Sequence, residues 1–501
     1  MSSQEAVEQA REREKAALSR RKFLGGMAAA GALALTSRRA SAAPNKPRPD
    51  VGIVGAGLAG LQCAYNLAAA GATPTLYEAS SRVGGRQHTL RGFFPGQVAE
   101  RGGELIDTGH KTMLAWVNRL GLTREDLRGG GEVFYYFDGQ RIPEASVVDE
   151  YRAFVAAMRG DLQASSGAPT ADVHNAADVQ LDNTNLTDYL TSRGAGRIAR
   201  KAIEEAYLAE YGRECAEQSA LNFLLFIHAD KRSKFTPFGT SDERFHVVEG
   251  NDRIASGIAA LLPKQPEFGM SLVRVRKTSG GRVELTFKQS NTTVTRTHER
   301  VVLAMPFTVL RTIELDASLA LPAWKKLAID QLGYGDNAKL MIGFKGPYWA
   351  ELGSNGASYS DLANHQTTWE TSPSTATTER AILTDYSSGL RGKNLSSNVQ
   401  QEAAKFLADL EKVFPGAAAN VAKTGNSVLA HLEHWPSNPL TRGSYTCYLP
   451  GQFTSIGGNE GKCCGNLHFA GEHTNSFYWW QGYMEGALLS GMDAAAEILA
   501  T

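Results

Sequence analysis

The sequence has no apolar segment long enough to span a bilayer and no excess of charge of either sign. Lys plus Arg and Asp plus Glu number 52 each, so charge alone gives no reason to expect a nucleic acid or an anionic surface as a partner. Charged residues make up 21% and hydrophobic residues 42% of the chain, as in ordinary globular proteins. The 501 residues can hold two or more domains with sizeable cores.

Cysteine is scarce, and its positions exclude two kinds of stabilisation. The five cysteines are Cys63, Cys215, Cys447, Cys463 and Cys464. An odd and scattered set does not form a disulfide framework; the adjacent pair, Cys463 and Cys464, is either a vicinal disulfide or, more simply, two thiols. No Cys-x-x-Cys or Cys/His spacing is typical of zinc, and residues 431–434 (HLEH) lack the HExxH pattern. We therefore expect no metal.

The first 42 residues have the pattern of an export signal. Ser19-Arg20-Arg21-Lys22-Phe23-Leu24 precedes a weakly apolar stretch over 25–35, and Ala40-Ser41-Ala42 has the form of a cleavage site. The apolar stretch is too short and too rich in Gly and Ala to cross a bilayer. The pattern predicts a twin-arginine signal peptide over residues 1–42 and a periplasmic or secreted protein.

The segment 50–78 has the pattern of a dinucleotide-binding βαβ unit. It comprises an expected strand at 51–54, a GxGxxG sequence at 55–60, an expected helix at 58–70 and an expected strand at 75–77. Glycines there let the backbone turn tightly and approach a pyrophosphate, which the helix N-terminus favours. Glu78 is placed to accept hydrogen bonds from a ribose 2′-hydroxyl, and its charge disfavours a 2′-phosphate and hence NADP. Arg82 and Arg86, beside Gly-Gly turns, suit further phosphate contacts.

The middle of the chain alternates between helical and strand-like patterns. We expect helices at 198–211 and 221–229, and a third helix after Asn251 that has Ile254, Ile258 and Leu261 on one face. We expect strands at 132–137, 271–276, 283–287, 300–306 and 427–432. We expect loops over 351–380. The four phenylalanines between 221 and 240 (Phe223, Phe226, Phe235 and Phe238) suit a helix-packing core better than a substrate entrance. Lys339 interrupts an otherwise apolar strand at 335–344, where an edge-strand lysine reaching solvent is the plain alternative to a functional one.

The C-terminal part repeats the pattern of a strand that leads into a glycine turn. Residues 466–474 (NLHFAGEHT) form that strand and turn, and residues 478–487 (YWWQGYMEGA) lead into a helix of small residues. Small residues let a helix approach a cofactor or a neighbour closely. The helix N-terminus near Gly482 favours negative charge by about 0.3–1 kcal/mol.

Taken together, the blocks 51–104, 245–306, 335–344 and 442–494 resemble the flavin amine oxidase family, which includes monoamine, polyamine and L-amino acid oxidases. The resemblance covers most of residues 48–501. It implies an α/β fold in which a discontinuous, Rossmann-like FAD-binding domain carries an inserted α+β substrate domain. The implied FAD domain comprises 48–125, 246–328 and 435–501, and the implied substrate domain comprises 126–245 and 329–434.

The resemblance also implies an FAD site. Its residues are Gly55, Gly57, Ala59, Gly60, Glu78, Ala79, Arg82, Gly85, Arg86, Gly102, Gly103, Glu104, Gly471, Glu472, Gly482, Tyr483 and Met484. Asn251 is a departure, since the family has a glycine there. Ser444 stands where mammalian monoamine oxidases carry the cysteine that is joined to the flavin. A serine does not form that thioether, so we expect non-covalent FAD; attachment at Cys447 would need a register shift.

Three residues inherit catalytic positions from this resemblance. Lys339 matches the family's lysine that hydrogen-bonds through water to flavin N5, and Tyr445 and Tyr483 match the two aromatics that flank the amine. Ordinary core aromatics are the alternative for the two tyrosines. The implied reaction transfers a hydride equivalent from the amine-bearing carbon to the flavin, followed by imine hydrolysis and reduction of O2 to H2O2.

The substrate class divides the family, and the sequence favours L-amino acids slightly over simple amines. An amino acid oxidase needs an arginine for the α-carboxylate, and Arg91, Arg101 or Arg442 could supply it. Glu104 could instead hold a substrate cation, or pair with Arg101. Alternatives are a monoamine or polyamine oxidase, an amine dehydrogenase that uses a periplasmic carrier, and a non-catalytic FAD-binding partner; an NAD dehydrogenase explains the least. A homodimer is left open.

Overall fold

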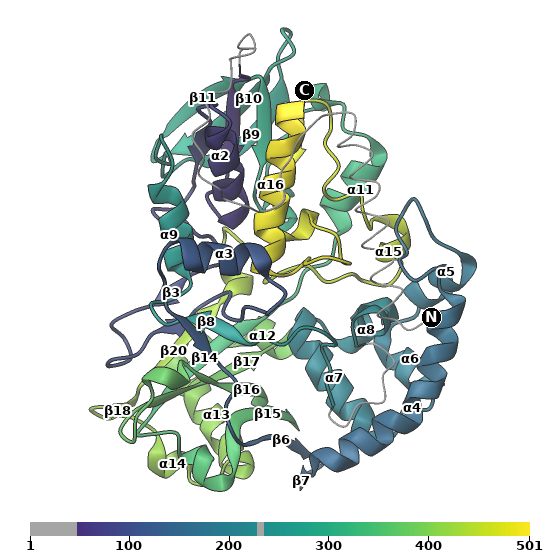
Figure 1. Cartoon of the computed structure of the whole chain (residues 1–501), viewed down its shortest axis with the longest axis vertical. Helices are drawn as coiled ribbons and strands as arrows, with labels where there is room; N and C mark the ends of the chain where they lie inside the picture. The colour runs from purple at the N-terminus through teal and green to yellow at the C-terminus, as the bar shows by residue number, and fades with distance from the viewer. Residues whose placement is uncertain (1–47, 228–234, 501) are drawn as a thin grey trace, which may run out of the picture.

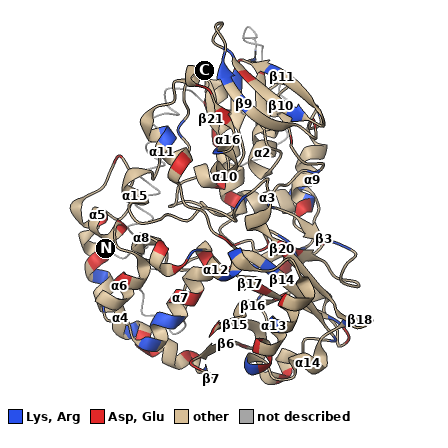
Figure 2. Ribbon diagram, turned by 180° about the vertical axis from the view of Figure 1, so that it is seen from behind, with Lys and Arg blue, Asp and Glu red and all other residues tan. Residues whose placement is uncertain are grey.

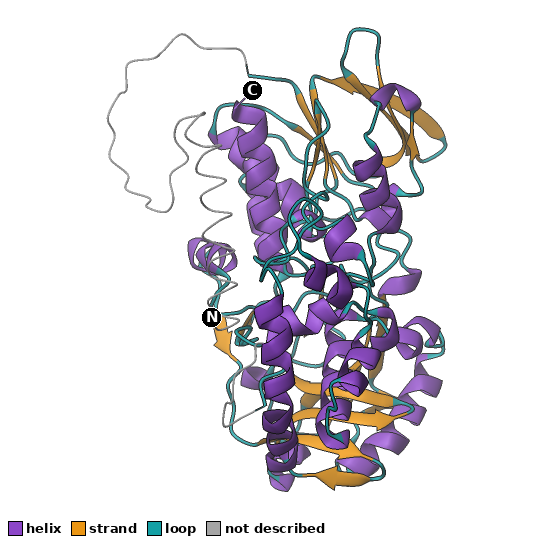
Figure 3. Ribbon diagram, turned by 90° about the vertical axis from the view of Figure 1, so that its right-hand side faces the viewer, coloured by secondary structure: helices purple, strands orange, loops and turns teal. Residues whose placement is uncertain are grey.

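The computed structural model describes residues 48–227 and 235–500. The predicted signal peptide at 1–42 and the last two residues of the helix predicted over 221–229 lie outside this range. Within it, no helix combines the length and apolarity that crossing a membrane requires. The molecule is elongated, and its strands gather toward the two ends of the long axis (Figures 1 and 3). Basic and acidic residues are intermixed along the ribbon (Figure 2).

The first sheet is parallel and has the order β2-β1-β12-β21. Its strands are β1 (Val51–Val54), β2 (Thr75–Tyr77), β12 (Arg300–Leu303) and β21 (Leu467–Phe469), so three distant segments of the chain build it. Helices α2 (Leu58–Ala69) and α16 (Met484–Ala500) lie side by side against it (Figure 1). A Cβ on Gly491 would lie 2.2 Å from the carbonyl oxygen of Ala59, so the small residues of α16 permit this close approach.

A second sheet, with the order β11-β10-β9-β13, extends the same end of the molecule. Its strands are β9 (Ser271–Lys277), β10 (Val283–Gln289), β11 (Thr292–His298) and β13 (Glu314–Leu315). The preceding helix, α9 (Asp252–Ala260), buries Ile254 and Ile258 as expected. Leu261 does not join them: the helix ends before it, and Leu261 is 46% exposed.

The third sheet has seven strands in the order β20-β14-β17-β16-β15-β6-β7. They are β6 (Glu132–Phe137), β7 (Gln140–Ile142), β14 (Ala338–Phe344), β15 (Ser354–Leu362), β16 (His365–Thr371), β17 (Ala381–Ser387) and β20 (Ala430–His434). The expected loops over 351–380 are thus wrong, because β15 and β16 occupy most of that stretch. Their polar residues pair internally: the hydroxyls of Ser358 and Thr368 are buried and lie 2.6 Å apart.

The strand expected at 427–432 is also interrupted. Ser427–Val428 (β19) pairs with Lys423–Thr424 (β18) as a small hairpin, and β20 begins only at Ala430. Leu429 lies at the change of partner: its amide still donates to the Ala422 carbonyl of the hairpin at 2.9 Å, whereas its carbonyl accepts from the amide of Gly343 in β14 at 2.8 Å. The backbone therefore switches partners within the stretch that the sequence pattern presented as continuous.

Helices flank the third sheet. The large ones are α4 (Glu144–Ala164), α7 (Arg197–Tyr211), α8 (Ala220–Ile227) and α13 (Val399–Val413). The remaining elements are β3 (Thr89–Leu90), β4 (Ala99–Glu100), α3 (Lys111–Arg119), β5 (Arg124–Asp126), α5 (Ala176–Asp182), α6 (Leu186–Ser192), β8 (Phe245–Val247), α10 (Phe307–Leu310), α11 (Ala323–Gln331), α12 (Gly389–Asn394), α14 (Ala417–Asn420) and α15 (Gln452–Ser455), besides short 3-10 turns. Phe223 and Phe235 are core residues, as expected.

Candidate active site

A cavity of about 1480 Å³ begins at the GxGxxG turn and extends to Lys339, Tyr445 and Tyr483. Most of the residues implied for FAD line it, and so do all three implied catalytic residues. Phe226 and Phe238 line it too, so two of the four phenylalanines expected in the core are at the cavity wall. No cysteine among the described residues does so.

The glycines of the first turn have two separate tasks. A Cβ on Gly60 would lie 1.9 Å from the carbonyl oxygen of Gly55, and a Cβ on Gly55 would lie 2.5 Å from that of Ala304. These two glycines let β1, β12 and α2 pack. A Cβ on Gly57 would meet no atom within 4 Å, although Gly57 lines the cavity. Gly57 therefore leaves room for a ligand at the N-terminus of α2.

The same N-terminus is left open for an anion. Gly57 is the N-cap of α2, and no side chain caps the helix there. The first amides of a helix need a partner, and a phosphate suits them in both charge and geometry. Glu78 closes the unit from β2: its carboxylate accepts hydrogen bonds from the amides of Ala56 and Ser80, both at 2.8 Å. These contacts fix Glu78 beside the cavity, where an acceptor for a ribose hydroxyl is expected.

The two expected phosphate-binding arginines differ in their contacts. Arg82 donates to the carbonyls of Val83, Gly85 and Gln87, so it holds its own loop in shape. Burial lowers the pKa of its guanidinium. Arg86 reaches across the molecule and donates to Glu472 Oε1 at 2.8 Å.

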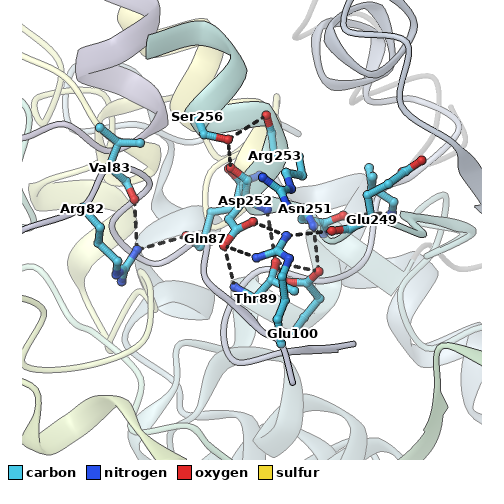
Figure 4. A network of polar contacts seen from close by, with 12 residues as sticks. Arg82, Val83, Gln87, Thr89, Glu100, Glu249, Asn251, Asp252, Arg253 and Ser256 are labelled. Atoms are coloured by element: carbon cyan, nitrogen blue, oxygen red, sulfur yellow. Dashed lines mark hydrogen bonds and ion pairs between the residues drawn. The ribbon is translucent and has the colours of Figure 1, made fainter. Parts of the chain in front are cut away.

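A polar network connects the segment 89–100 with the residues around Asn251 (Figure 4). Thr89 donates to both carboxylate oxygens of Glu100, and the Asn251 amide donates to Glu100 Oε1 at 2.7 Å. Arg91 forms an ion pair of 2.6 Å with Asp252. The side chain of Asn251 donates to the carbonyls of Gly103 and Glu104. Asn251, which departs from the family's glycine, therefore fastens the returning segment to the cavity wall.

Glu472 joins three segments at the centre of the cavity. Besides Arg86, its carboxylate accepts from the hydroxyl of Thr446 at 3.0 Å and from the amide of Gly482 at 2.9 Å. Nearby, Met484 packs on the backbone of Gly103, where a Cβ would lie 2.8 Å from the methionine sulfur. Both residues thus line the cavity.

Lys339 is buried inside the third sheet, so the edge-strand alternative is wrong. Its strand, β14, lies between β17 and β20, and Lys339 is 4% exposed. Its ammonium donates to the carbonyls of Glu100 and Gly102 at 3.1 and 2.8 Å and to Glu104 Oε2 at 2.6 Å. The other oxygen of Glu104 accepts from Trp369 Nε1 at 3.0 Å. Glu104 therefore pairs with Lys339, whereas Arg101 pairs with Glu433.

The aromatic end of the cavity surrounds this ion pair. The Lys339 ammonium lies 5.3 Å from the Trp369 ring, which contacts the Tyr386 ring at 5.3 Å. The hydroxyls of Tyr386 and Tyr445 lie 3.1 Å apart. Tyr483 donates to Glu210 Oε1 at 3.1 Å. The structure thus brings the three implied catalytic residues to one wall, each held by a specific polar contact.

Carboxylates dominate the charge at this end. Glu104, Glu210, Asp242 and Glu243 line the cavity. Burial raises the pKa of Glu210 to about 7 and that of Glu243 well above its usual range. Glu243 also has a backbone φ of 43°, a left-handed conformation that is strained for a residue with a side chain. Such strain is found mostly at functional sites.

The arginines proposed for a substrate carboxylate are engaged or lie elsewhere. Arg91 and Arg101 are paired with Asp252 and Glu433, and Arg442 is exposed; none of the three lines the cavity. The arginines that do line it, among the described residues, are Arg82, Arg86, Arg124 and Arg128. The first two are bonded as described above, and the last two are exposed.

Sequence reasoning missed Trp369, Tyr386, Glu210 and Glu243. The register of β14 and β17 pairs Lys339 directly with Tyr386, and Trp369 lies on the next strand, β16. These neighbours cannot be found before the strand order is known. Glu210 does carry a signal, because it is an acidic residue within the apolar repeat of helix α7.

The cavity fits FAD. It supplies an open helix N-terminus, a glycine facing free space, a carboxylate at the ribose position and a ring-sized aromatic end. The Ser444 hydroxyl donates to Asn337, and Cys447 is fully buried and does not line the cavity. A thioether to the flavin is therefore not available from either residue.

Comparisons with known proteins agree with this geometry. The family model of flavin containing amine oxidoreductases matches residues 58–499. An L-amino acid dehydrogenase of Synechocystis sp. is 26% identical over 90% of this chain and 94% of its own. An L-amino-acid oxidase of Siganus canaliculatus is 24% identical over 89% of this chain and 84% of its own. Among solved structures, cyclohexylamine oxidase from Brevibacterium oxydans has a TM-score of 0.75 and 21% identity over 90% of this chain and 99% of its own.

Proposed function

Because the chain belongs to the family of flavin containing amine oxidoreductases, we propose that it oxidises small primary amines that enter its cavity as cations. It is an FAD-dependent enzyme, and FAD, when bound, would supply the acceptor for a hydride from the carbon that bears the amine, after the ammonium has lost a proton. The proposed products are an imine, hydrolysed to the carbonyl compound, and H2O2 from O2. A periplasmic carrier in place of O2 is the alternative acceptor.

The residues of the chain have distinct proposed roles. Gly57 and the α2 N-terminus hold the pyrophosphate, and Glu78 holds the ribose. Tyr445 and Tyr483 restrict the amine to one orientation and exclude water, which lowers the entropic part of the barrier. Lys339, fixed by Glu104 and two carbonyls, presents a buried positive charge next to Trp369.

The single observation that carries the choice of substrate is the sign of the charge at the aromatic end. Glu210, Asp242 and Glu243 line the cavity, and Lys339 forms an ion pair with Glu104. A cationic amine would favour the ionised forms of Glu210 and Glu243 and would be attracted by them, whereas the carboxylate of an amino acid would oppose their ionisation and would lack an uncommitted buried arginine.

L-Amino acid oxidation, the substrate class that the sequence favoured, is the second candidate. The names of the two curated relatives above support it. Arg124 and Arg128, at the exposed part of the cavity wall, are the arginines that would have to meet the α-carboxylate.

Anaerobic reduction of the bound flavin separates the two candidates. The purified protein is mixed with L-amino acids and with the amines that correspond to them after decarboxylation, and loss of the flavin band at about 450 nm is followed. Bleaching by the amines alone supports the proposal. Bleaching by the amino acids alone overturns it in favour of the second candidate.

Glu210→Gln is expected to weaken amine binding and to remove its dependence on pH near 7. The pKa of Glu210 is raised to about 7, so the wild-type carboxyl is neutral below that pH and ionised above it. KM for a cationic amine should fall as pH rises through 7. Gln keeps the acceptor for Tyr483 but cannot ionise, so KM should rise about 10-fold at pH 8.

Glu204→Gln is the matched control, because Glu204 lies on the same helix but outside the cavity and pairs with Arg200. Steady-state kinetics from pH 6 to 9 measure both variants. If Glu210→Gln keeps the wild-type inflection, the proposed role of Glu210 is wrong.

We propose further that the chain is exported by the twin-arginine route. The support is the Arg20-Arg21 sequence and the Ala40-Ser41-Ala42 site. Cell fractionation of a variant with both arginines changed to lysine should find the protein in the cytoplasm rather than outside the inner membrane. Export of that variant at the wild-type level would contradict the proposal.

A further inference from the structure

Three side chains of metal-binding type meet at the far end of β21, away from the large cavity. Cys463, His468 and Glu497 each offer one ligand atom, and these atoms lie within 4.8 Å of one another. The spacing in sequence, five and then 29 residues, matches no zinc motif, which is why the sequence predicts no metal. We propose that the three residues form a binding site for Zn²⁺ or a cation of similar preference.

A tight turn fixes the first two ligands. Cys464 and Leu467 exchange two backbone hydrogen bonds, of 2.8 and 3.1 Å, as an antiparallel bridge. The next pair outward is therefore Cys463 and His468, which stand opposite each other and project from the same face. Asn466, inside the turn, donates to the carbonyls of Gly281 and Glu299. The turn is thus anchored to neighbouring strands, and its two ligands are positioned by backbone geometry.

The third ligand comes from the last turns of α16. The carboxylate of Glu497 forms a hydrogen bond of 3.0 Å with Nδ1 of His468. His468 is 2% exposed, and its Nε2 atom has no hydrogen-bond partner in the described part of the chain. Nδ1 is therefore the ring nitrogen that faces the Glu497 carboxylate, so a cation between the two groups would replace this hydrogen bond, and Nε2 would carry the ring proton.

The dimensions and the donor types suit zinc. A cation midway between two atoms 4.8 Å apart is roughly 2.4 Å from each, close to zinc bond lengths of about 2.0–2.3 Å. A thiolate, an imidazole and a carboxylate favour zinc over magnesium or calcium. Cys463 is exposed and lines a shallow hollow with Pro322 and Trp324, so a cation can enter from solvent. A water can complete a tetrahedral site.

One nearby positive charge opposes the metal. Lys325 interacts electrostatically with both thiols and with Glu497, and its ammonium donates to the carbonyls of Asn459 and Glu460. Burial lowers its pKa to about 8, so Lys325 stays charged at neutral pH and this opposition weakens only above about pH 8. Cys464 is the other thiol in reach, but it stands opposite Leu467 in the bridge rather than opposite His468, so Cys463 is the better ligand.

A metal here would tie β21 to the end of α16. The strand leads within three residues to Gly471 and Glu472 of the cavity wall, and α16 begins at Met484, which also lines the cavity. The expected role is therefore structural: metal binding to the folded state raises its stability and leaves the flavin site unchanged.

Calorimetric titration of Zn²⁺ into the flavin-loaded, tag-free chain, after treatment with a chelator, tests the site. We expect one Zn²⁺ per chain and a higher Tm when it binds. Cys463→Ser and Glu497→Gln should each weaken the affinity about 10-fold or more, whereas Cys464→Ser should leave it unchanged.

Circular dichroism verifies that the variants fold. Changing the exposed Cys463 and the half-buried Glu497 leaves the buried His468 in place. The proposal is overturned if the wild-type chain binds Zn²⁺ no more tightly than about 100 µM. It is equally overturned if Cys464→Ser weakens binding as much as Cys463→Ser does.

Discussion

Gly60→Ala is expected to yield a chain that neither folds stably nor retains flavin. The added methyl group would lie 1.9 Å from the carbonyl oxygen of Gly55, which is backbone and cannot move aside. Relief requires separating α2 from β1, and overpacking of this kind costs about 3 kcal/mol or more of the free energy of unfolding. The measurements are urea unfolding and the ratio of flavin to protein absorbance after purification.

Two other glycines separate folding from binding in this experiment. Gly160→Ala places a methyl group on the exposed side of α4, where no atom lies within 4 Å, and should stabilise the chain by about 0.5–1 kcal/mol. Gly57→Ala directs its methyl group into the cavity, so the chain should fold normally but hold FAD more weakly. Normal flavin content in Gly60→Ala would show that this helix does not pack as described.

Local patterns predicted the first βαβ unit well, because every contact that defines it is short in sequence. Val51–Val54, the glycine turn and the helix agree with the structure within a residue. The strands β15 and β16 were missed because their buried positions hold serine and threonine, whose hydroxyls pair across the sheet. Hydrophobic periodicity does not identify a buried strand position when that position holds a polar side chain whose hydrogen-bond partner lies on another strand.

The candidate site was predictable only in part. Resemblance placed Lys339, Tyr445 and Tyr483, but no pattern connects Lys339 with Glu104, which is 235 residues away in the chain. Arg101, one of the alternatives considered for Glu104, instead forms an ion pair with Glu433, the residue paired with Lys339 in the register of β14 and β20. The carboxyl groups of Glu210 and Glu243 could be assigned to the site only from the structure, because they line the cavity, and they are the basis for proposing amines rather than amino acids as substrates.

Lys339→Met is expected to affect both stability and catalysis. Met has a similar length but leaves the Glu104 carboxylate buried without its cation, and breaking a buried ion pair from one side costs about 3–5 kcal/mol. Loss of the positive charge that we propose acts on the flavin should slow flavin reduction or reoxidation about 100-fold or more. Chemical denaturation and anaerobic stopped-flow absorbance measure the two effects separately.

The double variant Lys339→Met, Glu104→Leu distinguishes a catalytic lysine from a structural one. Replacing both members of a buried ion pair with apolar residues is often close to neutral for stability, so the double variant should recover most of the stability lost in the single one. Its reaction with the amine should remain slow, because the positive charge is still absent. If stability and rate recover together, Lys339 acts only by supporting the cavity wall through Glu104 and Trp369, and the catalytic role assigned to it is wrong.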